Sequence, residues 1–166
     1  NMAVFAYVIG LGKADGLEMD FISPVLAAAS WIGIAGSGLV ILLSTRFGRA
    51  WPLAGSILLT ALATWALHGS EFAWVYALAN GLIGVTWSFG IPYLLGMCAQ
   101  FDQTGQSAAL GGFASKMGMA SGPLVAAWVV GADDFSRVIN VGAVALVLAL
   151  VAAMIPAILL DRAPID

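Results

Sequence analysis

Charged residues in this chain are confined to short stretches between long apolar runs, with one exception. Lys, Arg, Asp and Glu make up only 9% of its 166 residues, whereas soluble domains carry about 25%. An apolar run of about 20 residues is long enough to cross the hydrocarbon core of a bilayer as a helix. The runs are continuous and do not alternate in polarity as the strands of a membrane barrel do. The pattern therefore predicts an all-α, polytopic integral membrane protein.

The apolar runs predict six transmembrane helices joined by short loops. The predicted spans cover residues 2–12, 24–43, 52–67, 72–97, 107–131 and 138–160. Ser23 followed by Pro24 is a typical helix start, which places the beginning of the second span at Pro24. The first span is only about half the usual length, and the chain opens on Asn1. We therefore expect a piece of a longer protein, beginning inside or just before a transmembrane helix.

Small residues in two of these spans predict close packing between helices. In the second span, Gly33 and Ser37 are four residues apart, with Gly36 and Gly38 beside them. In the fifth span, a stripe of small residues recurs every three or four positions, at Gly111, Ser115, Gly118 and Gly122. On a helix such spacing lets a neighbouring backbone approach closely.

Lys116 is the one charge that lies deep within a predicted span. It is nine residues beyond Ser107, or about 14 Å along a helix, close to the midplane of a core roughly 30 Å thick. A lysine stem does not easily bring its ammonium group to water from that depth. We interpret Lys116 as a substrate or coupling residue. The alternatives are a structural ion pair, a misplaced span and a lysine that does reach the interface.

Two stretches of the chain are similar to those of a known family. Between the second and third spans, Arg46-Phe47-Gly48-Arg49 resembles the basic RxGR loop of the major facilitator superfamily, which is cytoplasmic and repeats in each six-helix half. After the fourth span, the turn from Asp102 to Gly105 precedes a glycine-rich helix that contains Gly122-Pro123. This stretch looks like the tenth and eleventh helices of such transporters. The aspartate that the fuller family motif carries before the basic loop is absent here.

The resemblance covers all six spans, by topology more than by sequence, and it implies a fold. The chain would be the C-terminal half, helices seven to twelve, of a twelve-helix transporter whose N-terminal half is absent. Each half consists of two inverted three-helix repeats, and solutes bind near the bilayer midplane. The first and fourth spans would line the central cavity, and the second and fifth would flank it.

The resemblance also implies roles for single residues. Candidate substrate-binding or coupling residues, on spans that line or flank the cavity, are Tyr7, Asn80, Trp87 and Lys116. Candidate gating residues of the loops are Arg46, Gly48, Arg49 and Asp102. Helix packing is the alternative role for the first three residues. Topology-setting positive charge is the alternative role for the two arginines.

Together these features predict a secondary transporter that moves a small organic solute by alternating access, with proton coupling left open. Lys116 favours an organic anion, and a drug-like efflux substrate is the alternative within the superfamily. The competing class is a non-transport scaffold or assembly subunit that binds a partner through its small-residue stripes. A scaffold should bury Lys116 against a fixed acidic partner, whereas a transporter should leave it beside a water-accessible cavity.

Several function classes do not fit the sequence. Cys98 is the only cysteine and His68 the only histidine, so neither a zinc site nor an intramembrane hydrolase is expected. The sequence contains no Gly-rich phosphate loop and no basic tract for nucleic acid. We therefore expect no enzyme activity, metal or cofactor. The expected partners are the lipid bilayer, a small-molecule solute and the missing six-helix half.

Basic loop residues predict the orientation of the chain. Arg46, Arg49 and Arg162 fall on one side of the predicted spans, and Lys13 and Arg137 on the other. Cytoplasmic loops carry an excess of positive charge. We therefore expect the first group and both chain ends to be cytoplasmic, in the inner membrane of a bacterium.

Overall fold

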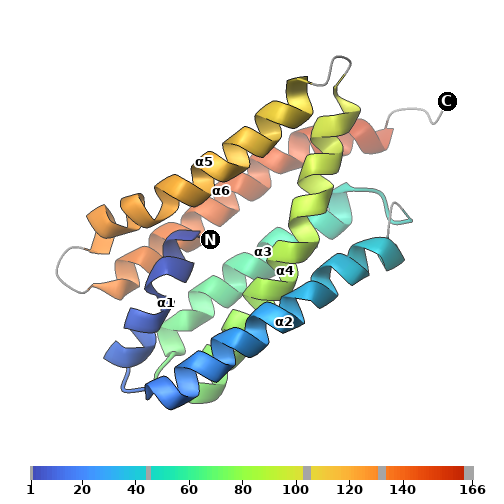
Figure 1. Cartoon of the computed structure of the whole chain (residues 1–166). Coiled ribbons are helices and arrows are strands. Elements are labelled where there is room, and N and C mark those ends of the chain that lie inside the picture. The colour runs from blue at the N-terminus through green and yellow to red at the C-terminus, as the bar shows by residue number, and fades with distance from the viewer. Residues whose placement is uncertain (1, 44–45, 103–105, 131–133, 163–166) are drawn as a thin grey trace.

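A computed structural model describes residues 2–43, 46–102, 106–130 and 134–162, and these residues form helices joined by short connections (Figure 1). In chain order the elements are α1 (Met2–Ala14), α2 (Met19–Leu43), α3 (Ala50–Ala66), the short 3-10 helix η1 (Leu67–Gly69), α4 (Ala73–Gln100), α5 (Gln106–Val130) and α6 (Phe135–Arg162). The described ranges contain no β-strand. The predicted all-α class and the six α-helices are therefore confirmed.

Four of these helices are long and apolar enough to cross a membrane. They are α2, α3 together with η1, α4 and α6. The helix α1 has 13 residues, which corresponds to about 20 Å, and α5 is not among the four although it has 25 residues. Glycine, alanine, serine and Lys116 keep α5 less apolar than its neighbours. The structure thus supports an integral membrane protein with four candidate spans, and the six-span count stays a prediction.

The predicted helix start at Pro24 is wrong. The helix α2 begins at Met19 and carries Pro24 inside it. Its first turn forms upstream, where the carbonyl of Glu18 accepts hydrogen bonds from the amides of Phe21 and Ile22, both at 3.0 Å. Proline so close to a helix start removes only one backbone hydrogen bond. Continued pairing of the backbone therefore outweighs the local capping signal of Ser23.

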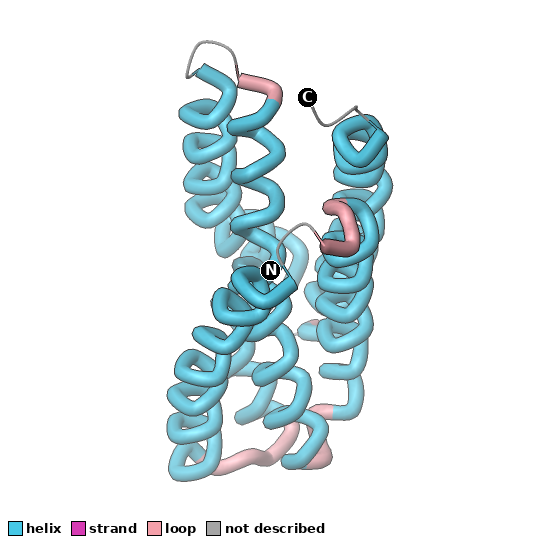
Figure 2. The backbone as a smooth tube through the Cα atoms, turned by 90° about the vertical axis from the view of Figure 1, so that its right-hand side faces the viewer, coloured by secondary structure: helices cyan, strands magenta, loops and turns pink. Residues whose placement is uncertain are grey.

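The helices run lengthwise through one bundle, and their connections gather at its two ends (Figure 1, Figure 2). The interface between α2 and α4 is the most extensive, followed by those of α3 with α4 and with α6. The short helix α1 packs mainly against α5 and contacts α6 as well. Its N-terminal end therefore lies near the middle of the bundle and not at either end (Figure 1).

Buried apolar side chains form two main clusters, one toward each end of the bundle. One cluster joins α1, η1, α4, α5 and α6 through Val4, Leu11, Leu67, Ala79, Ala126, Val138 and Ile139. The other joins α3, α4 and α6 through Ala50, Leu53, Phe89, Tyr93, Met97 and Ala157. On α4 the two clusters end at Ala79 and Phe89, so the middle of this helix belongs to neither.

Two further hydrogen bonds stabilise the end of the bundle where η1 lies. Ser70 is buried before α4, and its hydroxyl donates a hydrogen bond to the carboxylate of Asp15, just beyond α1. Tyr76 is fully buried on α4, and its hydroxyl donates to the carbonyl oxygen of Val8 at 3.1 Å. These contacts hold α1 against α4, although α1 lacks a full span of its own.

Glycines bring the backbones of α2 and α4 into direct contact. A Cβ atom added to Gly36 would lie 2.1 Å from the carbonyl oxygen of Val85, and one added to Gly84 would lie 2.8 Å from that of Ala29. Gly33 also faces the backbone of Gly84, at 3.2 Å. By contrast, an added Cβ at Gly38 has no neighbour within 4 Å. The close packing predicted for this stretch is therefore confirmed at Gly33 and Gly36.

We predict that Gly36→Ala destabilises the chain whereas Gly38→Ala does not. The new methyl group at position 36 forces the backbones apart, at a cost on the order of 1–3 kcal/mol. At position 38 it meets open space and gains helix propensity, up to about 1 kcal/mol. Melting temperatures in detergent micelles, followed by circular dichroism, compare the two variants. Equal melting temperatures would contradict the close contact.

Candidate functional site

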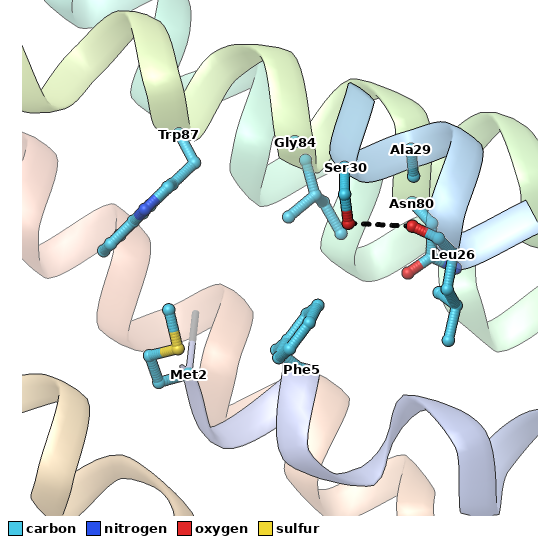
Figure 3. A pocket seen from close by; sticks show the side chains of 9 residues that line it. Met2, Phe5, Leu26, Ala29, Ser30, Asn80, Gly84 and Trp87 are labelled. Carbon is cyan, nitrogen blue, oxygen red and sulfur yellow. Dashed lines mark hydrogen bonds between the residues drawn. The ribbon is translucent and has the colours of Figure 1, made fainter. Parts of the chain in front are cut away.

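A cavity of about 120 Å³ lies between α1, α2 and α4, in the middle of the bundle (Figure 3). Its walls are apolar apart from Ser30, Asn80 and the indole N–H of Trp87, and the lining consists of Met2, Phe5, Leu26, Ala29, Ser30, Asn80, Ile83, Gly84 and Trp87. Asn80 and Trp87 are seven residues apart, which is about two helical turns, so they share one face of α4. The structure therefore brings two of the predicted substrate residues to one cavity.

Asn80 is buried, with 8% of its surface exposed. Its side-chain Nδ2 donates a hydrogen bond to the carbonyl oxygen of Tyr76 at 2.8 Å, whereas no described residue donates to its Oδ1. Ser30 commits its hydroxyl hydrogen to the carbonyl of Leu26 at 2.9 Å. Figure 3 shows the two side chains together at one end of the cavity, with Trp87 toward the other. This end therefore offers hydrogen-bond acceptors to a ligand.

A larger cavity of about 450 Å³ adjoins the first, between α4 and α5. Met2 and Trp87 line both cavities. The other residues that line the larger cavity are Ile91, Leu94, Leu95, Cys98, Gly111, Ala114, Ser115, Gly118 and Met119. Trp87 is fourteen residues into α4, about 21 Å from its start and thus near mid-length. The two cavities together reach the size of a small-molecule site.

Lys116 does not line either of these cavities. Its neighbours Ser115 and Met119 on α5 do, and consecutive helical residues point about 100° apart. The side chain of Lys116 is exposed, and it forms no ion pair or hydrogen bond with another described residue. Lys116 was expected to have a fixed acidic partner in a scaffold, or a place beside a cavity in a transporter. Among the described residues it has neither. Its substrate role stays a prediction.

Tyr7 lies on the opposite side of α1 from Phe5. It is half-buried and packs against the cluster around Val4, beside a small gap that Phe135 and Ile139 of α6 also line. The cavity with Asn80 and Trp87 is not in contact with it. The structure therefore places Tyr7 in the packing of α1 against α6, and a substrate role for it stays a prediction.

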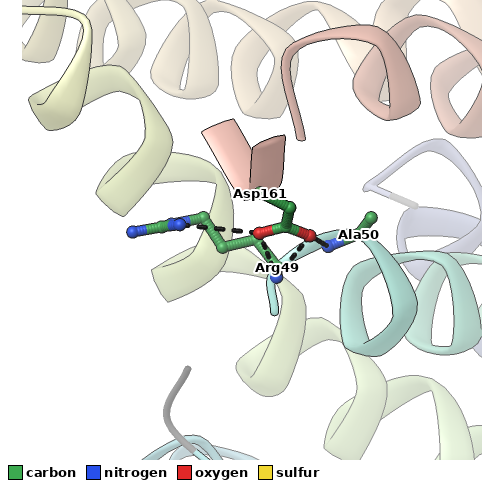
Figure 4. A network of polar contacts seen from close by, with 3 residues as sticks. All are labelled: Arg49, Ala50 and Asp161. Carbon is green, nitrogen blue, oxygen red and sulfur yellow. Dashed lines mark hydrogen bonds and ion pairs between the residues drawn. The ribbon is translucent and has the colours of Figure 1, made fainter. Parts of the chain in front are cut away.

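The basic loop before α3 wraps around a carboxylate that sequence reasoning missed (Figure 4). Asp161, in the last turn of α6, accepts hydrogen bonds from the backbone amides of Arg49, at 2.8 and 2.9 Å, and of Ala50, at 2.8 Å. These amides begin α3, so Asp161 caps that helix and places a negative charge at its positive end. The capping carboxylate is 112 residues from Arg49, so no local motif could reveal it.

Gly48 is required by this arrangement for two reasons. Its backbone has a positive φ of 70°, which side chains other than glycine rarely tolerate. A Cβ atom added there would also lie 2.7 Å from Oδ2 of Asp161. The glycine of the RxGR pattern therefore lets the loop close on the carboxylate.

The other loop residues lie at the same end of the bundle. The guanidinium of Arg49 is 3.5 Å from Oδ1 of Asp161 and lines a further cavity of about 310 Å³ with Tyr93 and Gln100. Arg46 is exposed. Asp102 caps α5, because its Oδ2 accepts a hydrogen bond from the amide of residue 108 at 2.9 Å, while Gly105 lies outside the described residues. Gating roles for these residues stay predictions.

Comparison of this chain with protein-family models, curated proteins and solved structures finds no match. The resemblance to the major facilitator superfamily therefore rests on the residues and topology of the chain itself.

We predict that Asp161→Ala lowers the stability of the chain by on the order of 2 kcal/mol, because the amides at the start of α3 lose their acceptor. That loss corresponds to a fall of about 4–8 °C in melting temperature. Asp161→Asn, which keeps an acceptor oxygen, should lose less. Arg162→Ala, at the exposed neighbouring position, is the control, and an equal fall there would contradict the capping role.

Proposed function

We propose that this chain forms part of a pathway through which a small organic solute crosses the membrane by alternating access, as in a secondary transporter. The observation that carries the proposal is the pair of adjoining cavities that meet at mid-length of α4, where they share Trp87 and Met2. Secondary transporters bind their solutes near the bilayer midplane. A cavity at that depth has no evident use in a protein whose helices only pack against one another.

The distribution of helices around the cavities supports a major facilitator arrangement. One cavity is lined by α1, α2 and α4, and the other by α1, α4 and α5, whereas α3 and α6 line neither. In the C-terminal six-helix half of that fold, the first and fourth helices line the central cavity and the second and fifth flank it. We therefore place the chain as this half, completed by an N-terminal half.

The same proposal fixes an orientation. Arg46, Arg49 and Arg162 belong to one end of the bundle, and Lys13 and Arg137 to the other. On the positive-inside rule, the end with the capped basic loop faces the cytoplasm of a bacterial cell. An ion gradient, with protons as one candidate, would drive the transport cycle.

The scaffold alternative loses support from the small-residue stripe of α5. An added Cβ at Gly111 would lie 2.9 Å from the sulfur of Cys98, and one at Gly122 would lie 3.1 Å from the amide nitrogen of Ala3. These two glycines are already used to pack α4 and α1 within the chain. The stripe is therefore occupied at two of its four residues and does not offer its full length to a partner.

Countertransport by the complete protein, with both six-helix halves, in proteoliposomes tests the proposal with two permanently charged probes that do not cross lipid unaided. They are 3-phenylpropyl-trimethylammonium and 3-phenylpropanesulfonate. We expect exchange of at least one probe, and we expect Trp87→Ala to reduce it about tenfold or more, because the side chain borders both cavities. Trp74→Ala, on the same helix but 68% exposed, is the matched control. Absence of exchange of either probe by folded protein would contradict the proposal.

The sulfonate probe also tests the organic-anion version. If Lys116 forms the anion site, as the sequence suggests, Lys116→Met abolishes exchange of the sulfonate and spares that of the ammonium. Because Lys116 does not line the cavities, this version requires α5 to turn or another chain to complete the site. Unchanged sulfonate exchange in Lys116→Met would exclude it.

A further inference from the structure

We infer that the cavity between α1, α2 and α4 binds the ammonium group of an apolar amine, while the apolar part of the same molecule lies in the larger cavity beside α5. The inference rests on the proposed function only in taking the bound molecule to be the transported solute. Binding itself follows from the lining of the two cavities.

The polar end of the smaller cavity is arranged to accept hydrogen bonds. The amide of Asn80 is oriented by its bond to the carbonyl of Tyr76, which leaves Oδ1 as the atom without a donor. Ser30 already donates to Leu26, so its oxygen is also left to accept. An N–H of an ammonium group satisfies such acceptors directly, and hydrogen bonds to charged groups are the stronger kind.

Aromatic side chains supply the second element of cation recognition. Phe5 comes to the cavity from α1 and Trp87 from α4, on two of its sides (Figure 3). The faces of aromatic rings attract alkylammonium ions, here from a half-buried Trp87 and from Phe5, which is 58% exposed. Apolar residues form most of the remaining wall, so the site selects a cation attached to an apolar group over a hydrated inorganic one.

The same lining disfavours an anion. No Lys, Arg or His is among the residues that line these two cavities. A carboxylate would lose its hydration against apolar walls and gain only the remaining N–H of Asn80 and the indole N–H of Trp87, with no positive charge to pair with, and unpaired charges are costly to bury. The smaller cavity, at about 120 Å³, fits a head group, and the adjoining 450 Å³ accommodates an aryl or alkyl body.

Equilibrium binding to the purified chain tests the inference with three probes of one shape. They are 3-phenylpropylammonium, its N-trimethyl analogue, which has no N–H, and 3-phenylpropanoate. We expect the ammonium to bind about tenfold or more tightly than the carboxylate. We expect Asn80→Leu to weaken the ammonium about tenfold and to leave the trimethyl analogue nearly unchanged, which also shows that the variant is folded. Trp87→Ala should weaken both cations, and Trp74→Ala, on the same helix but 68% exposed, neither.

Tighter binding of the carboxylate would overturn the inference, and so would equal binding of the ammonium to Asn80→Leu and to the unaltered chain. A failure of the transport proposal alone would give a different pattern of results. In that case the ammonium binds in an Asn80-dependent manner while neither permanently charged probe exchanges across proteoliposomes. Conversely, exchange of the sulfonate alone, without ammonium binding, overturns the inference and leaves transport standing.

Discussion

The direct contact between the backbones of α2 and α4 is the constraint on which the candidate site depends. Gly36 and Gly84 leave no room for a side chain between the two helices. Gly84 also lies between Asn80 and Trp87 on α4 and lines the cavity with them. The approach of α2 therefore fixes the far wall of the cavity, where Ala29 and Leu26 stand. If α2 and α4 lay further apart, the cavity would lose this wall, although the residues that line it would be unchanged.

The Asp161 cap and the Asn80–Trp87 cavity lie in different parts of the bundle, and this separation suits a protein that changes shape. The cap joins the end of α6 to the start of α3, two helices that line neither cavity. The cavities instead belong to α1, α2, α4 and α5. We interpret α3 and α6 as the fixed support of the chain. In the transport cycle that we propose, this arrangement would let the cavity-lining helices move against the proposed N-terminal half while α3 and α6 stay in place.

Much of the fold could be predicted from local sequence, because hydropathy and length identify an apolar helix without knowledge of its neighbours. The common position of Asn80 and Trp87 on one face of α4 could be predicted for the same reason, because residues seven positions apart lie about two helical turns from each other. The direction of Lys116, the packing of Tyr7 and the cap by Asp161 depend on how distant helices meet. These contacts cannot be read from any single stretch of sequence. At Ser23-Pro24 the local helix-start signal was misleading, because backbone hydrogen bonds begin the helix upstream, at Met19.

The measurement that tests the central claim most directly is the labelling of Cys98, which is half-buried and lines the larger cavity. A water-soluble, membrane-impermeant methanethiosulfonate is applied to each side of an oriented membrane in turn, with Cys98→Ser as the background. A water-filled pathway predicts that Cys98 reacts and that 3-phenylpropylammonium slows the reaction. Reaction only with a lipid-soluble maleimide, and none with the water-soluble reagent from either side, would contradict the account.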